Sequence, residues 1–182
     1  MFLISAITMR SFAEERKEGT YVLLATRPLT NLQIISAKYL ACLVLVSFAL
    51  LPTLVYCYSI AQLGLPKGNL DTGAVIGSYI GLFLLGSAFT AIGIFASSFT
   101  KNQVIAFAVS VFLCFFAYSG FDSVSKVSAF QSFESQLANL GIAEHYQSIS
   151  RGVLDTRDVV YFISFVALFF GLTHLVIGGR KW

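Results

Sequence analysis

The chain contains few side chains that could carry out chemistry, and their spacing favours neither catalysis nor metal binding. Its 182 residues include two histidines and three cysteines. Metal ligation needs a cluster of His, Cys, Asp or Glu side chains, whereas His145 and His174 are expected on opposite sides of a membrane. No phosphate-binding glycine loop, no Ser/His/Asp order and no basic stripe for nucleic acid is present. We therefore expect no cofactor, no metal site and no nucleotide hydrolysis by this chain itself.

The composition is that of a membrane protein. Hydrophobic residues make up 57% of the chain and charged residues only 12%, whereas soluble domains carry about 25% charge. Four stretches without a charged residue are each about 20 residues or longer, which is enough to cross a bilayer as a helix; they are residues 39–66, 72–100, 102–121 and 159–179. Cys42, Cys57 and Cys114 fall inside these stretches, where cysteine behaves as a small apolar residue. The sequence predicts an all-α polytopic protein with four complete transmembrane helices.

Residues 10–38 hold the densest group of charges. This segment contains eight of the 21 charged residues, namely Arg10, Glu14, Glu15, Arg16, Lys17, Glu18, Arg27 and Lys38. Residues 14–18 suit a helix, and Gly19 is expected to end it because glycine is a poor helix former. Thr20 is then placed to cap a short apolar turn at residues 21–24, and Pro28 stops that turn.

A second helix start follows at once. Thr30 and Gln33 have the spacing of a capping box, in which each side chain satisfies a free backbone amide of the other residue. Two interpretations of the segment remain open. It is either an ordinary solvated loop or a docking platform for a soluble partner, since an apolar turn below a membrane has no core of its own.

The first nine residues are apolar but too short to span a bilayer. At about 1.5 Å per residue they cover less than half of a core roughly 30 Å thick, and the order of charges is wrong for a signal peptide. We expect residues 1–9 to be the end of a spanning helix whose beginning is missing, from a fragment or an internal start. Residues 10–30 are then a loop, and residues 31–182 a transmembrane domain with an outer segment at 122–157.

Basic residues predict the orientation, because they are retained on the cytoplasmic side. Placing residues 10–38 and the C-terminus inside puts eight basic residues there and four outside. The inside set is Arg10, Arg16, Lys17, Arg27, Lys38, Lys101, Arg180 and Lys181, and the outside set is Lys67, Lys126, Arg151 and Arg157. The chain is therefore expected to be a multi-pass protein of the cytoplasmic (inner) membrane, with no nucleic-acid partner.

The spans carry two features of interest. The first is expected over residues 31–63 and contains Pro52, which removes one helix hydrogen bond. The second carries Gly73, Gly77 and Gly81 at a spacing of four, continued by small residues as far as Ser97. Such a stripe favours close helix packing in lipid. Whether it meets another helix of this chain or a second copy stays open, as does the plainer interpretation that glycine is common in membrane helices.

The outer segment contains two candidate elements. Apolar residues recur at spacings of three and four in residues 130–140, which favours an amphipathic helix. A polar piece follows at residues 144–152, in which Glu144, His145 and Arg151 are candidates to clamp the outer ends of the helices. Whether Glu144 and Arg151 pair with each other or clamp the helix ends stays open. Asp155 or Thr156 is expected to cap the last span.

One segment carries a family resemblance. The run Arg10-Ser-Phe-Ala-Glu-Glu-Arg-Lys-x-Gly-Thr, with Leu24 and Pro28 after it, resembles the cytoplasmic loop of ABC-2 type permeases. In that family a short coupling helix after Gly-Thr docks into the ATP-binding subunit. The whole chain is similar to the permease subunit of the gliding-motility-associated ABC transporter of Bacteroidetes, including residues 144–152 and 180–182.

The resemblance implies an architecture and partners. It implies a type V-like exporter with six helices, of which this chain retains four and a stub. It also implies a second permease copy or a related permease and two ATP-binding cassette subunits. The residues implied in ATPase docking are Glu14, Glu15, Arg16, Gly19, Thr20, Tyr21, Leu23, Leu24 and Pro28. One position departs from the family: Val22 stands where a glutamate is usual, so docking would depend on Tyr21, Leu23 and Leu24.

Three classes of function can be compared with these sequence features. The first is a permease subunit that couples ATP hydrolysis by a separate ATPase to transport, associated with gliding motility. The alternative is a non-transporting membrane scaffold that recruits a cytoplasmic partner. A membrane-embedded enzyme would need acid, base or nucleophile groups at matching depth in the spans, and the sequence has none.

Overall fold

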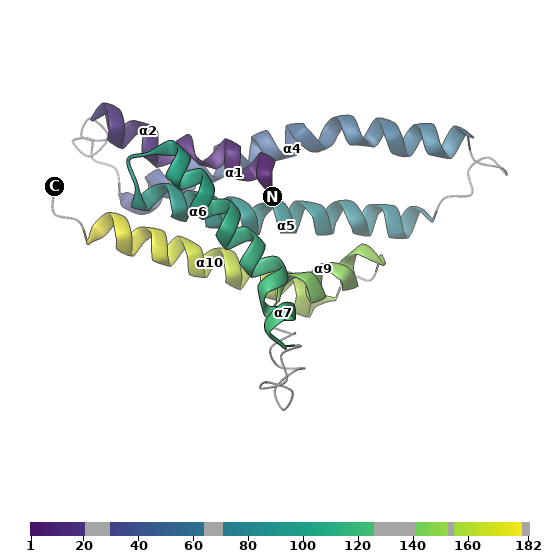
Figure 1. Ribbon diagram of the computed structural model, residues 1–182. Helices are drawn as coiled ribbons and strands as arrows, with labels where there is room; N and C mark the ends of the chain where they lie inside the picture. Colours follow the sequence, from purple (N-terminus) through teal and green to yellow (C-terminus); the bar gives the residue numbers. More distant parts are fainter. Residues whose placement is uncertain (21–29, 64–70, 126–140, 153–154, 180–182) are drawn as a thin grey trace.

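The computed structural model describes residues 1–20, 30–63, 71–125, 141–152 and 155–179, and over these residues it is helical without strands (Figure 1). In chain order the elements are α1 (Phe2–Thr8), α2 (Arg10–Glu18), α4 (Asn31–Leu63), α5 (Thr72–Phe99), α6 (Gln103–Phe115), the π-helix η1 (Phe116–Gly120), α7 (Phe121–Ser125), α9 (Ile142–Ser150) and α10 (Thr156–Gly178). Four helical stretches are long and apolar enough to cross a membrane: Asn31–Leu63, Thr72–Phe99, Gln103–Val124 and Thr156–Gly178. The predicted all-α fold with four spans is confirmed.

The long helices begin where the sequence predicts. The amide of Thr30 donates to Gln33 Oε1 at 3.0 Å and the amide of Gln33 donates to Thr30 Oγ1 at 3.3 Å, so the capping box is confirmed. Asp71 caps α5 by accepting from two amides, and Asp155 caps α10 by accepting from one. Each cap satisfies donors of a first helical turn that have no intrahelical acceptor.

Helix α5 is the centre of the bundle. It contacts α10, α6, α9, α1, α4 and α2, and Figure 1 shows the other helices arranged around it. Of its most apolar stretch, 72% is buried, against 11% for that of α4 and 17% for that of α10. The neighbours of α5 leave most of their own apolar surface exposed, as expected of lipid-facing helices.

Glycines let other backbones approach α5 closely. A Cβ atom added at Gly77 would lie 2.7 Å from the Cα atom of Gly152, and one at Gly81 would lie 2.9 Å from the side chain of Ile149. Gly152 itself has φ +86°, a conformation that favours glycine. Two of the three predicted packing glycines thus face α9 and the turn after it. At Gly73 an added Cβ would meet only the capping carboxylate of Asp71.

The outer elements differ from the sequence-based expectation. The third span was expected as one helix to about Phe121, but it passes through η1 before α7, and a π-helix leaves no periodicity signal that distinguishes it from an α-helix. Residues 142–150, expected only as a polar piece, form the amphipathic helix α9. The amphipathic helix expected over residues 130–140 lies outside the described residues.

We predict that Gly77→Ala weakens the packing of α9 against α5. The added methyl would meet backbone rather than a flexible side chain, and such overpacking costs about 1–3 kcal/mol. The apparent melting temperature of the purified protein in detergent should fall. The matched control is Gly171→Ala in α10, where an added Cβ meets nothing within 4 Å. Equal melting temperatures for the two variants would contradict the packing assignment.

Candidate functional site

Helix α2 lies at the start of residues 10–38, the segment with the densest group of charges. It follows α1 after Met9 and contacts α1, α5 and α6. Its inner face buries Phe12, Ala13 and Arg16, while the charged side chains of Lys17 and Glu18 are exposed. The helix ends at Gly19, whose φ of 73° places it in the left-handed region, so the predicted helix end is confirmed.

The first turn of α2 is capped by a residue from another helix. Met9, at the N-cap position, has no side-chain oxygen and makes no capping hydrogen bond. Instead Ser97 Oγ of α5 accepts from the amides of Phe12 (3.0 Å) and Ala13 (3.1 Å) and donates to the carbonyl of Met9 (3.0 Å). Ser97 is fully buried. A hydroxyl has one donor and two acceptor lone pairs, so Ser97 is saturated at this junction.

A buried arginine joins the other end of α2 to the same helix. The Arg16 side chain is only 5% exposed, and its guanidinium donates to the carbonyl of Ser98. Ser98 lies in the last turn of α5, where carbonyls lack intrahelical donors and carry the negative end of the helix dipole. The guanidinium therefore meets a carbonyl that needs a donor and a field that favours positive charge.

Lys38 of α4 holds α2 from the opposite side. Its Nζ lies 2.6 Å from Glu15 Oε1, donates to the carbonyl of Ser11 and stands 4.8 Å from the ring centroid of Phe12. The side chains of Lys38 and Glu15 are 17% and 28% exposed. Helix α2 is thus fixed between α4 and α5.

The predicted docking residues divide into two groups. Glu15 and Arg16 face the bundle as anchors of α2, as the contacts with Lys38 and Ser98 show. Glu14 is half-buried, and Gly19 and Thr20 are exposed. Thr20 donates to the carbonyl of Glu15 at 3.3 Å. Tyr21, Leu23, Leu24 and Pro28 lie outside the described residues, as does Val22.

At the opposite end of α5, a contact between a half-buried histidine and a buried aspartate joins α9 to α10. His145 Nδ1 lies 2.7 Å from Asp158 Oδ1, and the imidazole stacks on the Tyr161 ring with centroids 4.0 Å apart. Asp158 is only 6% exposed. Of the two alternatives for Glu144 and Arg151, pairing is not what the structure has: both side chains are exposed, and no ion pair joins them in the part of the chain that the structure describes. Helix α9 turns its buried face toward α5, which leaves these two residues pointing outward.

Helix α9 has further buried contacts. Ile142 and Ile149 are fully buried, and Ser78 of α5 donates to the carbonyl of Ser150 at 3.0 Å. Burial raises the pKa of the Tyr146 hydroxyl above its ordinary value, with a smaller contribution from Tyr118. Helix α9 as a whole thus packs against α5 and α10, and of the three predicted clamp residues His145 is the one that contacts α10.

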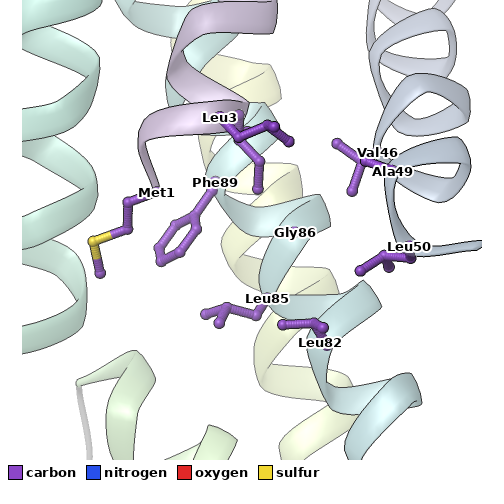
Figure 2. A pocket seen from close by; sticks show the side chains of 10 residues that line it. Met1, Leu3, Val46, Ala49, Leu50, Leu82, Leu85, Gly86 and Phe89 are labelled. Carbon is purple, nitrogen blue, oxygen red and sulfur yellow. The ribbon is translucent and has the colours of Figure 1, made fainter. Parts of the chain in front are cut away.

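A small cavity lies between α1, α4 and α5. Its volume is about 140 Å³, and Figure 2 shows the side chains around it. The lining is apolar and consists of Met1, Leu3, Ile4, Val46, Ala49, Leu50, Leu82, Leu85, Gly86 and Phe89. Such a lining offers no acid, base or nucleophile. Within the described ranges, no group of three His, Cys, Asp or Glu side chains could hold a metal ion.

Comparison with known proteins identifies a family. A family model described as "ABC-2 family transporter protein" matches residues 1–144. The matched range contains α1, α2, α4, α5 and α6 and therefore both anchors of α2. No curated protein matches the chain.

We predict that His145→Ala loosens α9. The buried carboxylate of Asp158 would lose its hydrogen-bond partner, and leaving a buried polar group unsatisfied costs about 1–3 kcal/mol. The apparent melting temperature should fall below that of the wild type. Glu144→Ala, a change of the adjacent exposed residue, should leave it almost unchanged. Matching values for the two variants would show that the pair does not hold the helix.

Proposed function

This chain belongs to the ABC-2 family of transporter proteins, and we propose that it is the membrane-spanning permease subunit of an ABC transporter whose ATP hydrolysis takes place in a separate subunit. It is a multi-pass membrane protein with four apolar helices. The sequence carries no phosphate-binding loop. ATP binding in a partner subunit is consistent with that composition.

The observation that carries the proposal is the double anchoring of α2. Residues 21–29 connect Thr20, next to α2, with Thr30, at the start of α4. Both flanks are held by the bundle, one through Arg16 and Lys38 and the other through Ile34 and Ile35, which are buried near the start of α4. Force applied to a segment held in this way displaces helices instead of only bending a loop.

In the proposed mechanism the ATPase supplies the displacement. Tyr21, Leu23 and Leu24 would dock into the ATPase subunit, with Glu14, Glu15, Arg16 and Gly19 shaping the platform. Closure of two ATPase subunits on nucleotide would push this coupling helix, and the flanking helices α2 and α4 would pass the displacement into the spans as a rigid-body shift.

The proposal also includes the orientation of the protein, its membrane and its biological role. Residues 10–38 and the C-terminus would lie in the cytoplasm, because this orientation places most basic residues inside. The complex would sit in the cytoplasmic membrane with a second permease copy or a related permease. Association with gliding motility is supported by the resemblance of the chain to that subgroup.

We expect Leu23→Asp combined with Leu24→Asp to abolish co-purification of the ATPase subunit. Two carboxylates would have to be desolvated at an apolar contact, while insertion into the membrane should be unaffected. The matched control is Val22→Glu, which adds a carboxylate to the same turn at the position where the family usually has glutamate, and it should retain the ATPase. Retention by the double variant would overturn the docking assignment, and a partner without an ATP site would favour a scaffold.

The proposed orientation can be tested with two single cysteines. Lys17 and Glu144 are both exposed and lie near opposite ends of α5. In a background without Cys42, Cys57 and Cys114, a membrane-impermeant maleimide should label Glu144→Cys in intact cells. It should label Lys17→Cys only after the cells are broken. Labelling of Lys17→Cys from outside would place the platform beyond the reach of any cytoplasmic ATPase.

A further inference from the structure

Two adjacent serines near the end of α5 have different hydrogen-bond partners. Ser97 and Ser98 both have no exposed surface. The Ser98 hydroxyl donates to the carbonyl of Phe95 in its own helix at 2.7 Å. The Ser97 hydroxyl bonds only to backbone groups at the α1–α2 junction in the contacts that the structure gives. The second serine completes a helix turn, whereas the first links two helices that are about 85 positions apart in the chain.

We propose that Ser97, together with Arg16, is a positioning residue that passes the displacement of the coupling segment into α5, and that α5 rather than α4 is the main route into the bundle. This inference rests on the proposed function. Ser97 would hold the first turn of α2 and Arg16 its last turn, so that the whole of α2 moves with the end of α5.

The burial of the two candidate routes supports this choice. Only 11% of the most apolar stretch of α4 is buried, so a shift of α4 meets few neighbours. Helix α5 has 72% of its stretch buried and contacts each of the other spans. Packed interfaces transmit small shifts because close-packed side chains do not deform continuously. A displacement delivered to α5 therefore reaches more of the protein.

The proposed displacement of α5 would reach α9 at the N-terminal end of α5. At about 1.5 Å per residue, Ser97 lies about 24 Å along α5 from Gly81. There Gly77 lies against the backbone of Ile149 and Gly152, and Gly81 lies against the Ile149 side chain. His145 joins α9 to α10. A rigid shift of α5 would therefore carry α9 with it. Movement of α9 relative to the outer half of α4 is the expected output.

The test compares Ser97→Ala with Ser98→Ala in the purified complex of permease and ATPase subunits. The Ser98 change removes a hydroxyl of the same burial but leaves intact the backbone carbonyl that accepts from Arg16. Spin labels at Glu144→Cys in α9 and Tyr56→Cys in α4, both exposed positions, report the distance between the two helices. The distance is measured without nucleotide and with a non-hydrolysable ATP analogue.

We expect a nucleotide-dependent change of distance in the wild type and in Ser98→Ala, and its loss in Ser97→Ala, with the ATPase bound in all three. A wild-type response in Ser97→Ala would overturn the inference. So would loss of the bound ATPase in that variant, because Ser97 would then act in docking. Failure of the wild type to bind any ATPase would instead refute the proposed function.

A second variant covers the case in which Ser97→Ala does not fold. Arg16→Lys keeps the positive charge but loses the planar guanidinium that reaches the Ser98 carbonyl. In the complexes that retain the ATPase, the nucleotide-dependent distance change should be reduced. A full wild-type response in Arg16→Lys would count against α5 as the route.

Discussion

The constraint on which this structure depends is the close approach of backbones to α5. Apolar side chains gain nothing by leaving lipid for another helix, so association in a membrane relies on small residues and on hydrogen bonds between helices. Helix α5 supplies both along one stripe. Gly77 and Gly81 lie against α9, and Gly93 lies against the Thr8 side chain of α1. Ser97 caps α2. This stripe places α1, α2 and α9 against α5, and the exposed apolar faces of the spans are left for lipid or other subunits.

Charged side chains are placed where helix ends can accept them. Arg16 lies at the C-terminal end of α5, and Asp158 lies in the first turn of α10. These are the ends at which the helix dipole favours a cation and an anion respectively. Asp158 is further stabilised by His145. A charge at mid-span would have no such compensation, so both buried anchors mark the ends of the bundle.

The sequence was a good guide to local structure and a poor guide to partners. The Thr30 capping box, the Asp71 cap and the helix end at Gly19 were predictable because their hydrogen bonds and dihedral angles involve residues within three or four positions. Ser97 was visible only as one more small residue of the stripe, since its partners lie about 85 positions away. Asp158 was not predicted as a contact residue, because the charge-free stretch that marks the last span begins at residue 159. Which charges meet depends on how α9 lies against α5, and no spacing in the sequence records that.

The two attachments of α2 differ in strength, which bears on how a load would be shared between them. The contact to α5 consists of fully buried hydrogen bonds to Ser97 and a buried guanidinium on the Ser98 carbonyl, and a hydrogen bond from a charged group contributes about 1.5–3 kcal/mol. The contact to α4 is made by Lys38, which pairs with Glu15 and donates to the carbonyl of Ser11, and the side chains of Lys38 and Glu15 are both partly exposed. Such pairs are screened by salt, and fully exposed ones contribute only about 0.2–1 kcal/mol. Under a common load α2 would stay with α5 and shift relative to α4, so a single displacement would change the relation between these two helices.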